Sequence, residues 1–217
     1  FKQLFRRIKG IKDWKSQDDV KAHSPGGNGL DYLTKYSKKE AWEMLTSPEW
    51  TRAIFVRDPR ERVLSAYLDK GQKENASYVR GHCCPLYGKC QKHASNSFRG
   101  FLEIISLCED PHWMPQTKRM ESPYWKYINF VGHIENGEED AKRLLKRIGA
   151  WDAYGKSGWG KSGKEPILAS KGSVNHATMA GDHMGQYFNT PEIEAMVKQF
   201  YRGDYLNPLF EFKTTDG

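Results

Sequence analysis

An arginine and a serine eight positions apart are the residues of this chain best suited to hold an anion. Arg57 follows a short apolar run at residues 53–56, and Ser65 lies in the segment after it. A guanidinium presents N–H donors in a planar fork that matches the oxygens of a phosphate, and a hydroxyl can donate one more hydrogen bond. The spacing therefore indicates that one phosphate could bridge Arg57 and Ser65.

A strand, a turn and a helix are predicted to position these two residues. Residues 53–56, A-I-F-V, are β-formers, as in a strand covered on both faces. Pro59 suits the first position of a helix, Asp58 suits its N-cap, and Glu61 completes the pattern of a capping box. The start of such a helix directs N–H groups and the positive end of its dipole toward an anion. The alternative is structural: the arginine pairs with a nearby carboxylate, and the serine is a surface hydroxyl.

The whole run of residues 53–70 resembles a known motif. It is similar to the 3′-phosphate-binding motif of Golgi carbohydrate sulfotransferases, whose donor is 3′-phosphoadenosine 5′-phosphosulfate (PAPS). The resemblance implies that Arg57 and Ser65 hold the 3′-phosphate of this donor. It extends over residues 1–212 and includes three further segments, the first two of which resemble the chondroitin/HNK-1 branch: D-P-H-W-M-P-Q at 110–116, F-V-G-H-I-E at 130–135 and F-Y-R-G-D-Y at 200–205.

The same resemblance implies a fold. We expect an α/β protein of the P-loop-NTPase-like sulfotransferase type, with a central parallel sheet flanked by helices and with long disulfide-bearing loops. At 217 residues the chain is expected to form a single domain, residues 1–217. The family's other donor site is a loop with a lysine that grips the 5′-phosphosulfate. Residues 1–8 look like the helix after that loop, so we expect the first strand and this lysine upstream of residue 1.

Two histidines are candidates for the general base that takes the proton of an acceptor hydroxyl. His112 is the first, because Pro111 and Trp113 would stiffen its position. His133, just past the end of a predicted strand, is the second, and the nearby Glu135 is a further candidate at the same strand end. The alternative for the first segment is that Trp113 packs in the core and His112 only caps. Glu135 is expected to hold a backbone N–H or an arginine.

Two segments rich in Gly, Ser and Lys could contact anions. Lys171 and Gly172 are expected to touch the nucleotide, because sulfotransferases of this kind close over it with a basic loop near the C-terminus; a loop without this role is the alternative. Residues 155–162 match G-x-x-x-x-G-K-S, but the sequence predicts no strand before them and no helix after them. We interpret this match as a loop, either at the rim of the active site, where it binds an anionic acceptor, or as a solvated linker.

The cysteines are clustered at four positions: Cys83, Cys84, Cys90 and Cys108. Zinc must be considered because His82 and His93 lie nearby, but the spacing lacks the paired Cys-x2-Cys that is usual for structural zinc. No metal is expected. Two disulfides are favoured, with Cys83 and Cys84 bonding separately to Cys90 and Cys108 in either arrangement. Such disulfides, and the glycosylation sequon at residues 75–77, suit a secretory lumen.

The net charge of +7, from 34 Lys and Arg against 27 Asp and Glu, suits polyanionic cofactors and substrates. The resemblance implies transfer of a sulfuryl group from PAPS to a hydroxyl of a carbohydrate or glycan acceptor, which can itself be anionic. It also implies the Golgi lumen, in a type II membrane protein anchored by an upstream segment. No run in this chain reaches the roughly 18 apolar residues of a membrane span.

The alternative function is a non-catalytic basic module that binds polyanions. It accounts for the positive charge, but it gives no reason for the spacing of Arg57 and Ser65. No nucleic-acid motif is recognised, so no nucleic-acid partner is expected.

Overall fold

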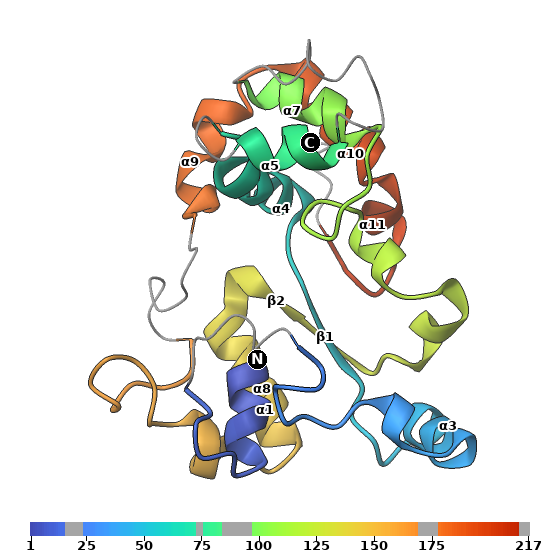
Figure 1. Ribbon diagram of the computed structural model, residues 1–217, viewed down its shortest axis with the longest axis vertical. Coiled ribbons are helices and arrows are strands. Elements are labelled where there is room, and N and C mark those ends of the chain that lie inside the picture. The colour runs from blue at the N-terminus through green and yellow to red at the C-terminus, as the bar shows by residue number, and fades with distance from the viewer. Residues whose placement is uncertain (16–23, 73–75, 84–96, 169–177, 213–217) are drawn as a thin grey trace. The chain divides into compact units, whose positions relative to one another are not determined.

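The computed structural model describes residues 1–15, 24–72, 76–83, 97–168 and 178–212 (Figure 1). Their contacts form two compact units, which are described separately. Unit 1 consists of Phe1–Ile54, Tyr127–Gly132 and Asn136–Ser173, and unit 2 consists of Phe55–Lys126, His133–Glu135 and Val174–Gly217. That the whole chain forms one domain stays a prediction.

The protein is mixed α/β with mostly helices, as expected from the sequence. The described residues form one small parallel sheet of two strands, β1 (Ala53–Val56) and β2 (Phe130–His133). The predicted bounds of β1 are confirmed. The prediction that this strand is covered on both faces is wrong, because Ala53 is exposed, Ile54 and Phe55 are only partly buried, and only Val56 is fully buried.

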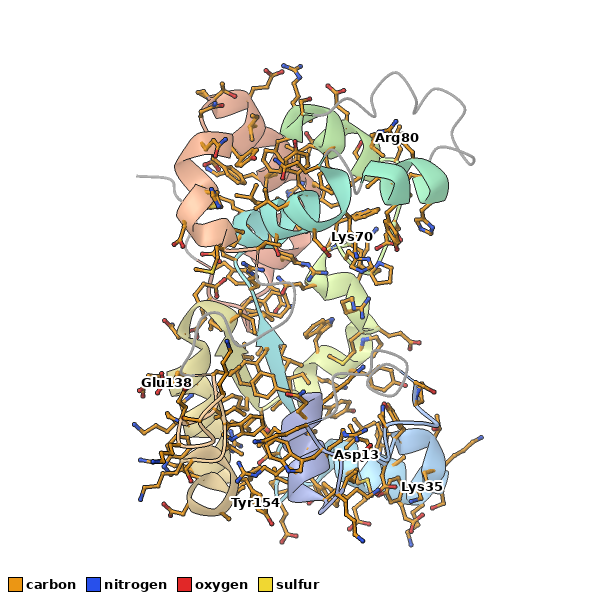
Figure 2. All side chains as sticks on the ribbon, turned by 60° about the vertical axis from the view of Figure 1, so that its left-hand side comes forward. Asp13, Lys35, Lys70, Arg80, Glu138 and Tyr154 are labelled. Atoms are coloured by element: carbon orange, nitrogen blue, oxygen red, sulfur yellow. A yellow bond between two sulfur atoms is a disulfide. The ribbon has the colours of Figure 1, made fainter. Side chains whose placement is uncertain are left out.

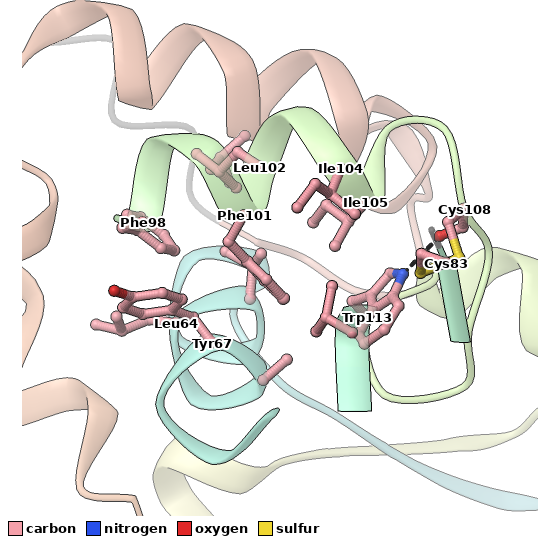
Figure 3. Packing of buried hydrophobic residues seen from close by; sticks show 14 of the residues in the cluster. Leu64, Tyr67, Cys83, Phe98, Phe101, Leu102, Ile104, Ile105, Cys108 and Trp113 are labelled. Carbon is pink, nitrogen blue, oxygen red and sulfur yellow. Dashed lines mark hydrogen bonds between the residues drawn. A yellow bond between two sulfur atoms is a disulfide. The ribbon is translucent and has the colours of Figure 1, made fainter. Parts of the chain in front are cut away.

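The helices of unit 2 surround one apolar core. They are α4 (Pro59–Ala66), α5 (Ala76–Cys83), α7 (Phe98–Ile105), α9 (Ala180–Tyr187), α10 (Pro191–Phe200) and α11 (Arg202–Leu206). The short π-helix η2 (Tyr67–Gly71) follows α4. The 3-10 helices η4 (Gln116–Arg119), η5 (Ser122–Tyr127) and η6 (Ile134–Asn136) lie entirely or mostly in the same unit. The ring of Tyr67 packs against the rings of Phe98 and Phe101 in this core, with centroid distances of 5.3 and 5.5 Å (Figure 3). Gly71 leaves room for the Phe101 ring, since a Cβ at this position would lie only 2.7 Å from the ring.

A disulfide closes the loop beside this core. Cys83, at the end of α5, bonds to Cys108 (Figure 3). This is one of the pairings that the sequence left open, while Cys84 and Cys90 lie outside the described residues. Within the described part of the chain, no three His, Cys, Asp or Glu side chains are arranged to hold a metal ion.

Unit 1 contains the N-terminal helix and the residues that pack against it. Its helices are α1 (Lys2–Ile8), α3 (Lys38–Thr46) and α8 (Gly137–Arg147), with the shorter turns η1 (Leu33–Lys35) and η7 (Trp151–Gly155). Leu4, Ala141 and Leu145 are fully buried. Arg6 is also buried and donates a 2.8 Å hydrogen bond to Asp13, which is labelled in Figure 2.

The G-x-x-x-x-G-K-S match in unit 1 is a bridged turn. Trp159 and Glu165 pair as an isolated antiparallel bridge, and Arg7 holds the start of the turn through the Tyr154 and Ser157 carbonyls at 2.9 and 2.8 Å. The turn follows η7 rather than a strand, and no helix follows it up to residue 168. It is therefore not a nucleotide triphosphate loop.

Within the residues that the structure covers, no helix is both long and apolar enough to cross a membrane.

Candidate anion-binding site

Arg57 lies at the junction of β1 and α4, in unit 2. Asp58 caps α4 as the sequence predicted, since its Oδ1 accepts hydrogen bonds from the backbone N–H groups of Arg60 at 2.8 Å and Glu61 at 3.3 Å. Pro59 occupies the first turn, where its missing N–H costs nothing. The local order of strand, arginine, cap and helix is therefore confirmed.

The second half of the predicted capping box is wrong. Glu61 does not accept the Asp58 N–H; Glu135 accepts it instead, at 2.6 Å. The prediction that Glu135 holds a backbone N–H is thus confirmed. Since the Asp58 and Glu135 carboxylates occupy these N–H groups, the backbone at the start of α4 does not offer them to an anion as expected.

The pKa of the Glu135 carboxyl group is also shifted. Partial burial of its carboxyl group raises its pKa, and the nearby carboxylates of Glu61 and Asp58 raise it further, although the N–H of Asp58 acts in the opposite direction. Glu135, just after β2, therefore favours its neutral form more than an ordinary glutamate does.

Glu61 pairs with the side chain of Arg57. Its Oε2 lies 3.4 Å from Nε and 3.3 Å from Nη2, and both side chains are about one-quarter exposed (25% and 26%). The carboxylate that the structural alternative required is thus present. Both distances are longer than a typical charge-assisted hydrogen bond, and pairs in contact with solvent contribute only about 0–1 kcal/mol. A doubly charged phosphate could therefore replace Glu61 as the partner of Arg57.

Ser65 lies one turn beyond Glu61 on α4. These two residues are four positions apart within the helix, which places them in one row along it. Arg57 precedes the N-cap and reaches this row through its side-chain contact with Glu61. Thr178, just before α9, donates a 2.9 Å hydrogen bond from Oγ1 to the Ser65 hydroxyl oxygen. Ser65 is therefore one of a pair of hydroxyls, and its own proton can still be donated. Sequence reasoning assigned no role to Thr178.

The first turn of α9 comes close to this row. A Cβ at Gly181 would lie 3.1 Å from the Glu61 carboxylate, so the glycine allows the close approach. The other two predicted nucleotide contacts, Lys171 and Gly172, lie outside the described residues.

Gln116 holds the backbone of Arg57. Its side-chain Oε1 accepts the Arg57 N–H, and its Nε2 donates to the Arg57 carbonyl, both at 2.8 Å. The carboxamide therefore binds both polar groups of one residue. Sequence reasoning quoted Gln116 within the D-P-H-W-M-P-Q segment but missed this role; its place in that segment was the only available signal.

His112 lies in a separate cluster of titratable groups. Its Nδ1 is 2.5 Å from Asp110 Oδ1, which also accepts the His112 backbone N–H at 2.8 Å. Asp110 Oδ2 accepts from the Tyr78 hydroxyl at 2.9 Å and lies 3.3 Å from His82 Nε2. Burial alone would raise the pKa of Asp110, but these hydrogen bonds from His112 and Tyr78 lower it below its usual range.

The two adjacent residues on which the interpretations of this segment rest lie in different environments. Trp113 is completely buried and donates its Nε1–H to the Cys108 carbonyl at 2.7 Å (Figure 3), while His112 is 43% exposed. His133, the last residue of β2, packs edge-on against Phe212 at 5.6 Å. In the described residues, no hydrogen bond or ring contact joins Arg57 to His112, so the structure does not bring this histidine into the same contact network.

Asp110→Asn is expected to flatten the acid side of the pH–stability profile. The folded-state pKa of Asp110 is lowered, so the unfolded chain, with a pKa of about 3.9, binds more protons. The stabilisation from this carboxylate is then fully present above about pH 4 and is lost as the pH falls through the folded-state pKa. Urea unfolding across this range tests the expectation, and equal pH slopes in the wild type and the variant would contradict it.

The fold and site define a class of protein: a mixed α/β protein whose first described strand is followed by an arginine and then by a helix that carries a serine. The sequence matches the model of the Sulfotransferase family over residues 1–213, and the chain belongs to this family.

Its relatives are carbohydrate sulfotransferases. The chain is 29% identical over 209 residues to carbohydrate sulfotransferase 9 of Homo sapiens, a match that covers 87% of this chain and 43% of that protein. It is 30% identical over 147 residues to carbohydrate sulfotransferase 14 of Danio rerio, covering 61% and 38% of the two chains. The chain thus spans less than half the length of these relatives. No solved structure matches it.

Proposed function

We propose that this chain carries a donor-binding site of a carbohydrate sulfotransferase, in which Arg57 and Ser65 hold the 3′-phosphate of PAPS. Family membership and the names of the relatives support the reaction class. The observation that carries the assignment of the site is the placement of Arg57: its backbone is fixed on both polar groups by Gln116, and its side chain contacts Glu61, which lies one turn before Ser65 on α4.

The residues present fit a phosphate. The Arg57 fork supplies charge-assisted hydrogen bonds, and the paired hydroxyls of Ser65 and Thr178 supply neutral ones. Glu61 is the acidic neighbour that such an anion must displace from Arg57. We further propose that Lys171 and Gly172 contact the nucleotide, as the resemblance implies.

The chemistry is sulfuryl transfer. The sulfur–oxygen bond to the donor phosphate breaks, a new bond forms between sulfur and the acceptor hydroxyl oxygen, and the hydroxyl proton goes to a base. His112 is the proposed base, because Asp110 holds its Nδ1 and leaves Nε2 to accept a proton. His133 is the second candidate. The carbohydrate acceptor, the P-loop-like fold and a Golgi location in a type II membrane protein remain parts of the proposal.

Binding of two nucleotides tests the proposed function. Adenosine 3′,5′-bisphosphate should bind saturably and at least about tenfold more tightly than adenosine 5′-monophosphate, because only the first carries the phosphate that Arg57 contacts. The affinity ratio should persist between about 50 and 200 mM salt. Weak binding of both nucleotides, with a steep salt dependence shared by any polyanion, would favour the polyanion-binding module instead.

A further inference from the structure

A buried carboxylate lies behind the candidate site. Asp204, in α11, is completely shielded from solvent. Its Oδ1 accepts the backbone N–H and the hydroxyl of Thr117, both at 2.8 Å. Its Oδ2 accepts the backbone N–H of Gln116 at 2.8 Å and the side-chain Nε2 of the same residue at 3.3 Å. One side chain therefore fixes the main chain of two residues and the orientation of an amide.

Residues 201–204 contact residues 113–117 at a second point. The hydroxyl of Tyr201, which is also fully buried, donates a 2.5 Å hydrogen bond to the Trp113 carbonyl. Gly203 permits the close approach, since a Cβ there would lie 3.0 Å from the Thr117 hydroxyl. The turn that carries Gln116 is thus held from one side by a rigid, buried polar network.

The same amide that Asp204 orients reaches forward to Arg57. Gln116 Nε2 is shared between Asp204 Oδ2 and the Arg57 carbonyl, which fixes the amide so that Oε1 faces the Arg57 N–H. An amide turned the other way would place its NH2 against the Arg57 N–H and its oxygen against both the carbonyl and the carboxylate. Asp204 therefore selects the orientation of Gln116 that binds the Arg57 backbone.

We infer that Gln116 and Asp204 are positioning residues for the 3′-phosphate site, acting on donor affinity through Arg57 without touching the donor. This inference rests on the proposed function. The planar guanidinium of Arg57 must meet the phosphate oxygens in a defined geometry. Motion of the Arg57 backbone would therefore weaken the interaction between the guanidinium and the phosphate. Asp204 supplies that constraint from the interior, and Gln116 transmits it.

The test is a mutant cycle read by calorimetric binding of adenosine 3′,5′-bisphosphate and adenosine 5′-monophosphate. Gln116→Met keeps the length of the side chain but removes its donor and acceptor. It should weaken binding of the bisphosphate about tenfold and leave the monophosphate nearly unchanged. In an Arg57→Ala background the same substitution should cost nothing further, because the side chain that it positions is gone. Gln116→Glu, which opposes a carboxylate to the Arg57 carbonyl and Asp204, is the second variant should the first not fold.

Thr117→Val is the matched control. It removes one hydrogen bond to Asp204 but no contact with Arg57, so it should lower thermal stability and leave the affinity ratio of the two nucleotides unchanged. Equal losses for both nucleotides in Gln116→Met, or a full further loss on top of Arg57→Ala, would overturn the inference and show a general loosening of the fold. If Arg57→Ala itself left the affinity ratio unchanged, the proposed phosphate site would fail first, and the positioning role with it.

Discussion

Arg57→Ala is expected to weaken the binding of adenosine 3′,5′-bisphosphate about 100-fold, while adenosine 5′-monophosphate binds almost as before. The expected loss corresponds to the two or so charge-assisted hydrogen bonds that a guanidinium fork makes to a phosphate. The substitution leaves the site otherwise intact, because Gln116 holds the N–H and carbonyl of residue 57, which alanine retains. Titration calorimetry with both nucleotides measures the effect.

Arg60→Ala is the matched control for that measurement. Arg60 is three positions further along the chain, in the first turn of α4. It has the same exposed fraction of 25% and carries the same charge, but it pairs with Asp58 and Glu194. If binding depended only on net positive charge, the two substitutions would weaken both nucleotides alike. Arg57→Lys should recover part of the lost affinity, since an ammonium supplies the charge without the fork. Equal effects of the two alanine substitutions would contradict the assignment of Arg57.

Local features of the site were predictable from the sequence. The bounds of β1 and the start of α4 follow from an apolar run and from Asp58 and Pro59, which act on their immediate neighbours. The i, i+4 spacing likewise places Glu61 within reach of Arg57. Such signals are readable because the residues concerned are fixed by one element of secondary structure, whatever the rest of the chain does.

The supporting contacts were not predictable, because they join distant parts of the chain. Gln116 and Glu135 meet the Arg57–Asp58 backbone across 59 and 77 positions, and Thr178 meets Ser65 across 113. The failed half of the capping box illustrates the limit: two glutamates compete for one N–H, and the tertiary fold decides in favour of the distant one. The segments at 110–116, 130–135 and 200–205 each supply one side chain to the contacts that hold the Arg57–Asp58 backbone: Gln116, Glu135 and Asp204. This gives the three segments a shared physical role that their separate sequences do not reveal.

Trp113→Ala is expected to lower the free energy of unfolding by about 3–5 kcal/mol. The indole is completely buried among the core side chains of unit 2, and its Nε1–H is bonded to the Cys108 carbonyl, so alanine leaves both a cavity and an unpaired acceptor. Urea unfolding measures the loss. Trp50→Ala is the control, because that indole is 45% exposed and its removal should change stability by about 0.5 kcal/mol or less. Equal effects of the two substitutions would mean that Trp113 is not a core residue.

The neighbouring substitution separates the two interpretations of this segment. His112→Ala removes a side chain that is 43% exposed, so its effect on stability should be small beside that of Trp113→Ala. If His112 is the base, sulfate transfer should nevertheless slow by about 10²- to 10⁴-fold in kcat, with little change in the KM for PAPS. Asp110→Asn should slow transfer as well, because it no longer holds Nδ1–H through a charged partner. A His112 variant with normal kcat and only a modest loss of stability would leave Trp113 as the reason for the segment and direct the search for the base to His133.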